Sequence, residues 1–173
     1  MYKNYIFDFY GTLADIRTDE DDPRLWIKMG EIYSALGAAY RPEELQSAFR
    51  RLEREQKEEI GGQDAEPDLT KVFAMLYKEK GASCPDVQAR MTAVTFRALS
   101  RKFLRAYDGV EELLRELREK GRGVYLLSNA QTDFTRPEIE MLGLTGYFDG
   151  IFISSEQGCK KPSAVFFERL LSC

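Results

Sequence analysis

The chain begins with a short apolar strand that ends in a carboxylate and a tight turn, and this feature most constrains the fold. The run from Asn4 to Phe9 is nearly apolar apart from Asp8, and Gly11 follows at once. A strand of this composition suits a parallel sheet that is covered on both faces. Ligands of open α/β sheets bind at the carboxyl ends of the strands. Asp8 is therefore the first candidate for a functional carboxylate.

Two later segments repeat the pattern of an apolar strand followed by a polar residue. Gly123 to Leu127 runs into Ser128, and Ile151 to Ile153 is followed by a loop that contains Lys161. Helical patterns lie between these strands, as parallel strands require. We therefore predict an α/β fold with a Rossmann-like parallel sheet core.

A long helical block separates the first strand from the rest of the chain. After an acidic stretch that we interpret as a linker, proline and glycine positions predict four helices, at roughly 23–36, 42–60, 69–81 and 85–106. We predict a core formed by residues 1–14 and 105–173 and an inserted α-helical cap over 15–104. Aromatic residues of the cap such as Trp26, Tyr33 and Tyr40 are expected mainly in its core.

The composition limits the chemistry available to this chain. It has no histidine, which excludes imidazole bases and histidine metal ligands. The three cysteines form no CxxC pair, so no disulfide framework or thiolate zinc site is indicated. The net charge of −4 gives no broad attraction to nucleic acid or membrane, and no apolar run reaches the roughly 20 residues of a membrane span. We expect a cytoplasmic protein that relies on carboxylates, lysine, hydroxyls and an oxygen-loving cation.

Asp8, Ser128 and Lys161 are expected to meet in one crevice, because all three follow strands of one parallel sheet. The carboxylate would attack a phosphoryl group or similar electrophile, the hydroxyl would hold anionic oxygens, and the ammonium would neutralise charge. Each residue also has an ordinary structural interpretation, as a turn former, a helix cap and a surface lysine. Lys160 is the alternative to Lys161.

These segments resemble the motifs of the haloacid dehalogenase (HAD) superfamily, whose members are mostly phosphatases. Ile6 to Leu13 resembles its first motif, Leu126 to Asn129 its second, and Gly158 to Pro162 with Phe166 its third. The helical block is similar to the cap that one branch of the superfamily inserts after the first strand. The resemblance implies a HAD-like core with a helical cap and hydrolysis of phosphate monoesters through an aspartyl-phosphate.

The resemblance also implies roles for individual residues. Asp8, Ser128 and Lys161 would be catalytic, and magnesium would be held by the Asp8 carboxylate and the main-chain carbonyl of Tyr10. Contacts to a small phosphorylated or anionic substrate would come from Tyr10, Gly11, Thr12 and Asn129.

Tyr10 departs from the pattern of the superfamily's phosphatases, which usually have an aspartate there as general acid and base. A phenol with an ordinary pKa of about 10 is a poor base at neutral pH, so alkoxide leaving groups would depart slowly. Tyrosine at this position is similar to the branch that hydrolyses 2-haloacids. That branch has an arginine after a Leu-Trp pair, whereas Ile27 follows Trp26 here. We favour a phosphatase, with a 2-haloacid dehalogenase or a catalytically silent anion-binding or interaction protein as alternatives.

The superfamily's fourth motif is expected beyond Lys161, and the sequence ends at Cys173 before reaching it. This motif is an acidic loop that completes the magnesium site, so we expect weak or absent magnesium binding and little turnover. The strand before it pairs with the first strand in the superfamily. The edge at Ile6 and Phe7 is therefore expected to be open to oligomerisation or to a swapped element.

Overall fold

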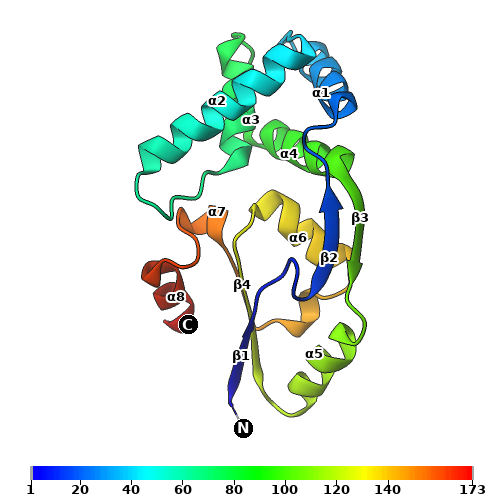
Figure 1. Cartoon of the computed structure of the whole chain (residues 1–173), viewed down its shortest axis with the longest axis vertical. Coiled ribbons are helices and arrows are strands. Elements are labelled where there is room, and N and C mark those ends of the chain that lie inside the picture. The colour runs from blue at the N-terminus through cyan, green and yellow to red at the C-terminus, as the bar shows by residue number, and fades with distance from the viewer. Residues whose placement is uncertain (1, 173) are drawn as a thin grey trace. The chain divides into compact units, whose positions relative to one another are not determined.

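The computed structural model of the chain describes residues 2–172. One compact unit comprises the described residues of Met1–Arg17 and Phe103–Cys173, and the other comprises Thr18–Lys102. We call them the α/β unit and the helical unit. The elements in chain order (Figure 1) are β1 (Asn4–Phe7), β2 (Ala14–Thr18), α1 (Pro23–Ala35), α2 (Pro42–Ile60), α3 (Leu69–Glu79), α4 (Asp86–Ser100), β3 (Arg101–Ala106), α5 (Val110–Glu119), β4 (Gly123–Ser128), α6 (Thr132–Met141), η1 (Thr145–Tyr147), β5 (Gly150–Ile153), α7 (Ser154–Gln157) and α8 (Ala164–Leu171).

The α/β unit contains a parallel sheet with the strand order β1-β4-β5. Phe7 pairs with Leu126 across β1 and β4, and Ser128 pairs with Ile153 across β4 and β5. The predicted α/β class with a parallel sheet is confirmed. Within residues 2–172, β1 is an edge strand, because β4 is the only strand of this sheet that pairs with it.

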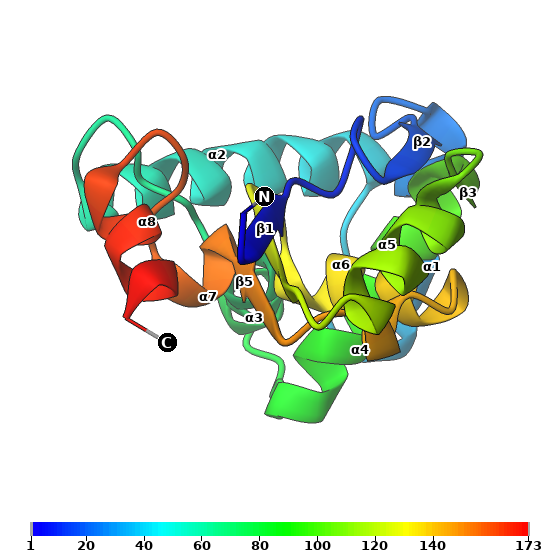
Figure 2. The ribbon, with the colours of Figure 1, turned by 90° about the horizontal axis from the view of Figure 1, so that it is seen from below.

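Both faces of this sheet are covered, which explains why its central strand is apolar from Val124 to Leu127. Val124 and Leu126 of β4 pack in one cluster with Leu114 of α5, whereas Leu127 packs in another with Phe166 of α8. Neighbouring residues of a strand point to opposite faces, so the middle of β4 needs apolar side chains at consecutive positions. Figure 2 shows β1 and β5 between α8 on one side and α5 and α6 on the other.

β2 and β3 form a separate two-stranded sheet, which the sequence analysis did not predict. The segment after Asp15 was expected to be a linker, and the last cap helix was expected to continue through β3. Tyr107 N donates to Leu13 O (3.0 Å) at one end, and Asp19 N donates to Ser100 O (2.8 Å) at the other, so the strands are antiparallel. The helix prediction was wrong past Ser100 because neither glycine nor proline marks that boundary.

The helical unit is built around one aromatic ring from each of its four long helices. Trp26, Phe49, Phe73 and Phe96 lie on α1, α2, α3 and α4, and neighbouring ring centroids are 5.2–5.6 Å apart. Trp26 is 3% exposed and Tyr33 0%, as expected for core residues. No helix in the described part of the chain is both long and apolar enough to cross a membrane.

Local signals explain where the helices of this unit begin. Asp22 Oδ1 accepts a hydrogen bond from Arg24 N at the start of α1, and Asp68 Oδ1 accepts one from Thr70 N at the start of α3 (both 3.0 Å). An N-cap of this kind stabilises a helix by about 1 kcal/mol. Proline occupies the first helical position of α1 and of α2, where its missing N–H costs no hydrogen bond.

Candidate active site

The carboxyl ends of β1 and β4 bring together residues from the two ends of the sequence. Asp8 follows β1 directly, Ser128 is the last residue of β4, and Lys161 lies in the loop before α8. Lys161 Nζ forms an ion pair with Asp8 Oδ1 at 2.9 Å and donates a hydrogen bond to Leu127 O at 2.8 Å. The carboxylate and the ammonium are therefore in direct contact, and the ammonium also contacts the residue before Ser128.

Asn129 holds the main chain of Lys161 in place. Its side-chain Nδ2 donates to Lys161 O (3.0 Å), and its Oδ1 accepts from Lys161 N (2.7 Å). Two opposed hydrogen bonds from one amide group fix both the position and the direction of the lysine's backbone. A role of Asn129 in positioning Lys161 thus accompanies its predicted contact with substrate.

The turn after Asp8 is held by its own main chain. Phe9 N donates to Asp8 Oδ1 (2.8 Å), Gly11 N donates to Ala14 O (2.9 Å), and Thr12 N donates to Phe9 O (3.2 Å). Gly11 has φ +76°, in the left-handed region, where an L-residue would be strained although the space is open. The N–H groups of Gly11 and Thr12, both predicted to contact substrate, are thus engaged within the turn.

Ser128 differs from the serine that follows β5. It is 1% exposed, and its Oγ has no hydrogen-bond partner in the described part of the chain. Ser154 is equally buried, but its Oγ accepts from Ala130 N (2.8 Å) and donates to Ala130 O (3.1 Å). Leaving a buried hydroxyl unpaired costs about 1–3 kcal/mol, so the Ser128 hydroxyl is suited to meet a ligand oxygen.

The phenol of Tyr10 forms hydrogen bonds with residues of α6. The sequence analysis did not predict this contact. Its hydroxyl donates to Glu138 Oε2 and lies 3.0 Å from Thr135 Oγ1. Glu138 is 1% exposed and Thr135 0%. One feature of the sequence could have indicated this contact. Glu138 lies one helical turn after Phe134, which places its carboxylate on the apolar face of the helix. The helix itself starts at Thr132 and includes Pro137 in its interior.

The residues at the end of β1 suit a magnesium ion that keeps most of its waters. The Asp8 carboxylate and the Tyr10 main-chain carbonyl are hard oxygen donors of the kind magnesium prefers. Within residues 2–172, no group of three or more His, Cys, Asp or Glu could hold a metal ion. Water and substrate would therefore supply most of the coordination shell.

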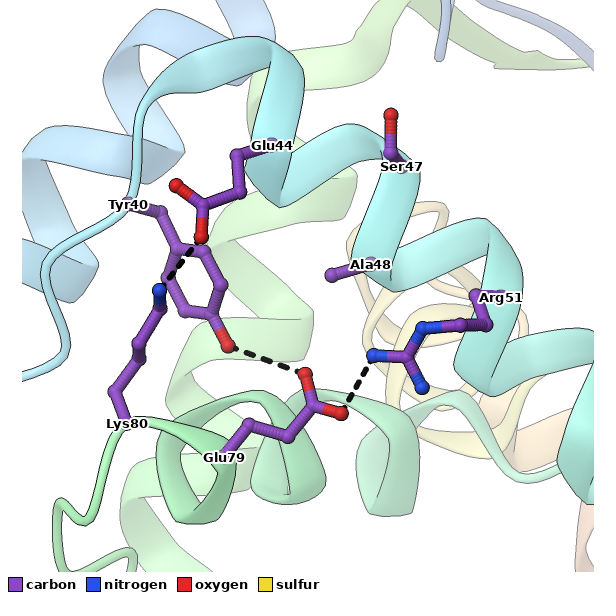
Figure 3. Close-up of a pocket in the computed structure, with 7 residues that line it drawn as sticks. All are labelled: Tyr40, Glu44, Ser47, Ala48, Arg51, Glu79 and Lys80. Atoms are coloured by element: carbon purple, nitrogen blue, oxygen red, sulfur yellow. Dashed lines mark hydrogen bonds and ion pairs between the residues drawn. The ribbon is translucent and has the colours of Figure 1, made fainter.

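A pocket of about 500 Å³, which we call the helical pocket, lies within the helical unit between α2 and α3 (Figure 3). Its four charged side chains pair with one another, Lys80 with Glu44 at 2.6 Å and Arg51 with Glu79. Burial and the nearby Glu79 raise the pKa of Tyr40 to about 12. This pocket is internally neutralised, and it is lined by Tyr40, Glu44, Ser47, Ala48, Arg51, Glu79 and Lys80.

Comparison with known proteins gives the class to which this fold and site belong. The sequence profile of the haloacid dehalogenase-like hydrolases matches residues 2–172, and the chain belongs to this family. It is 39% identical over 57 residues to a ribulose-1,5-bisphosphate 5-phosphatase of Halopiger xanaduensis, covering 33% of this chain and 24% of that protein. It is 31% identical over 107 residues to a phosphoserine phosphatase of Thermus thermophilus, covering 62% of this chain and 42% of that protein.

The chain thus spans less than half the length of these two curated relatives. Among solved structures, a HAD family enzyme from Bacteroides thetaiotaomicron superposes with a TM-score of 0.56 at 19% identity, covering 98% of this chain and 77% of that one. This likeness supports the fold, and the relatives are hydrolases at the level of the family.

Proposed function

We propose that this chain carries the site of a phosphatase that transfers a phosphoryl group from a small phosphate monoester to Asp8 and then to water. The observation that carries the proposal is the 2.9 Å contact between Asp8 Oδ1 and Lys161 Nζ. It joins the nucleophile of the first motif to the cation of the third. The curated relatives, which are phosphatases by name, support the choice of substrate class.

The geometry supports a division of labour within the Asp8 carboxylate. Oδ1 already accepts a hydrogen bond from Phe9 N and forms the ion pair with Lys161 Nζ. We therefore assign the attack on phosphorus to Oδ2, while the contacts to Oδ1 hold the carboxylate in one orientation. Lys161 offsets the negative charge shared by nucleophile and phosphate, and the Ser128 hydroxyl donates to a phosphate oxygen.

Asp8 and the main-chain carbonyl of Tyr10 would hold a magnesium ion in this proposal. When bound, the ion supplies positive charge against the phosphate oxygens. With two protein donors, binding is expected to be weak.

The test measures phosphate release from small monoesters in the presence of magnesium. Asp8→Asn should lower kcat by about 10⁴-fold, which corresponds to about 5.5 kcal/mol. Asp108→Asn is the matched control, because Asp108 is an exposed carboxylate of the same unit that follows β3, which is not a strand of the parallel sheet, and it should retain full activity. Turnover that survives in Asp8→Asn would refute the nucleophile.

Two other outcomes would replace the proposal with an alternative. Phosphate binding that depends on Lys161, without turnover of any ester, would indicate a silent anion-binding protein. Chloride release from 2-chloropropionate without added metal would indicate a dehalogenase.

A further inference from the structure

The proton of the Tyr10 hydroxyl is committed to a bond inside the α/β unit. This hydroxyl donates to Glu138 Oε2 and lies 3.0 Å from Thr135 Oγ1, and both partners are almost completely buried. To protonate a leaving group, the hydroxyl would have to give up this bond in surroundings with little access to water, which costs free energy. The geometry thus makes Tyr10 poorly placed to act as a general acid.

The neighbouring groups hold their protons or charges in other contacts. The turn from Phe9 to Ala14 contains no carboxyl group. The next carboxylate, Asp15, is paired with Arg105 at 2.9 Å. The ammonium of Lys161 is ion-paired with Asp8 and donates a hydrogen bond to Leu127 O.

We propose that this site selects phosphate esters whose leaving group departs without a proton, namely aryl, enol and acyl phosphates, and that Tyr10 held by Glu138 determines this selectivity. The inference rests on the proposed phosphatase function and names its substrate class. General acid catalysis contributes about 10²- to 10⁴-fold to such reactions. Alkyl esters lose that contribution here, whereas esters with acidic leaving groups do not need it.

The two steps of the reaction balance without an acid on the enzyme. In the first, Asp8 Oδ2 bonds to phosphorus, and the bond from phosphorus to the leaving oxygen breaks with its electron pair, releasing an aryloxide, enolate or carboxylate. In the second, water attacks phosphorus, the bond to Oδ2 breaks with its pair returning to Asp8, and the proton of the water passes to solvent. The second step also lacks a base, so the phosphorylated Asp8 should accumulate.

The test is a series of leaving groups, measured as kcat/KM for 4-nitrophenyl phosphate, phenyl phosphate and glycerol 1-phosphate. The wild-type chain should prefer the nitrophenyl ester to the glycerol ester by at least about 10³-fold, with phenyl phosphate between them. Tyr10→Phe should keep this preference, since it supplies no acid. Tyr10→Asp should reduce the preference by about 10²-fold, because a carboxyl group at this position can protonate the leaving oxygen.

Tyr147→Phe is the matched control, because the Tyr147 hydroxyl donates to Glu111 Oε1 (3.2 Å) in another phenol–carboxylate pair of the same unit. It should leave the ratio between the esters unchanged. A further readout is a burst of nitrophenolate equal to the enzyme concentration, from the accumulating intermediate.

The outcomes separate this inference from the function on which it rests. Similar kcat/KM values for the nitrophenyl and glycerol esters, with activity lost in Asp8→Asn, would overturn the selectivity and keep the phosphatase. Activity that survives in Asp8→Asn, or no turnover of any ester, would overturn both. A steep wild-type series that Tyr10→Asp leaves unchanged would refute the part assigned to Tyr10. Should Tyr10→Asp fail to fold, the wild-type and Tyr10→Phe series still decide the selectivity.

Discussion

The two units of this protein treat their polar groups in opposite ways. In the helical unit, the four charged side chains around the pocket pair among themselves, and Tyr40 Oη donates to Leu76 O at 2.8 Å. In the α/β unit, the Ser128 hydroxyl is buried without a partner in the described residues, and the Asp8 side chain remains 42% exposed. The helical pocket therefore neutralises its charges internally, whereas the Ser128 hydroxyl keeps an unmet capacity for hydrogen bonding.

The apolar parts of the two units differ in the same sense. The helical unit closes its core with one ring from each long helix. The α/β unit keeps β1 at the edge of its sheet, where Ile6 is 45% exposed. The oligomerisation or strand exchange predicted for this edge stays a prediction. The helical unit thus buries its aromatic residues in one cluster, whereas the α/β unit leaves an apolar strand edge exposed.

The largest effect is expected from destabilising the core of one unit and measuring how the unfolding of each unit responds. Phe96→Ala should cost about 3–5 kcal/mol, because its fully buried ring contacts those of Trp26, Phe49 and Phe73. The single tryptophan, Trp26, lies in this core, so its fluorescence follows unfolding of the helical unit. The midpoint of that transition should fall markedly.

Leu114→Ala is the control for this measurement, because Leu114 is fully buried in the α/β unit. It should cost about 2–5 kcal/mol in circular dichroism and leave the Trp26 transition nearly unchanged. Equal shifts of the Trp26 transition in both variants would mean that the units unfold as one, which would end the comparison of separate cores.

Replacing one lysine in each unit tests where the functional charge lies. Lys161→Met should lower kcat/KM by about 10²- to 10³-fold, because both the nucleophile and the phosphate lose their cation. Lys80→Met removes the cation that lies 4.3 Å from the Tyr40 ring centroid in the helical pocket, and phosphate release should stay at the wild-type rate. A large loss of activity in Lys80→Met would assign a function to the helical pocket.

Two of the buried serines, Ser128 and Ser154, sharpen the argument about unsatisfied groups. Ser128→Ala removes a hydroxyl without a partner, so stability should stay the same or rise by about 1 kcal/mol, while phosphate affinity falls about tenfold. Ser154→Ala breaks the bonds to Ala130 and should cost about 1–3 kcal/mol with little effect on affinity. Thermal denaturation and calorimetric phosphate titration measure the two quantities. Equal destabilisation of both variants would contradict the assignment of Ser128 to a ligand.

The smallest expected effect is a change in acid stability at the exposed rim of the helical pocket. The hydrogen bond from Lys80 lowers the pKa of Glu44 from its ordinary value of 4.5. A lowered folded-state pKa stabilises the fold above the ordinary value, and this contribution disappears as the pH falls through the folded-state value. Glu44→Gln should therefore slightly flatten the decline of the Trp26 midpoint in acid, whereas Glu43→Gln, on the same exposed turn, should not. Identical acid profiles for these two variants would remove the pair from the pH response.

The parallel sheet was predictable because its strands have apolar residues at consecutive positions, and a polar residue follows each of these apolar runs. Strands β2 and β3 were missed for a physical reason. Their exposed and half-buried positions include Asp15, Arg101, Lys102 and Arg105, and such residues suit a linker or a helix equally well. Their hydrogen bonds come from a partner far along the chain, which no local pattern reveals.

The strand ends predicted that Asp8 lies near the loop containing Lys161, since parallel strands align those ends, and the resemblance to the family favoured Lys161 over Lys160. The partners of Tyr10 could not be foreseen in the same way. Thr135 and Glu138 lie on a helix face, and only the packing of α6 against the turn after β1 brings them to the phenol. A carboxylate on an apolar helix face indicates that a polar partner is needed, but the pattern does not identify that partner.

The residue at position 11 is restricted by the handedness of the backbone and not by the space available for a side chain. Nothing lies within 4 Å of the position where a side chain would begin, yet the backbone there has φ +76°. A mirror-image alanine, introduced by chemical synthesis, would adopt this conformation readily and restrict the unfolded chain, which is worth about 0.4–1 kcal/mol. The ribosomally encoded alanine would strain the turn that carries Asp8. Among genetically encoded residues, this position beside the proposed nucleophile thus favours the achiral one.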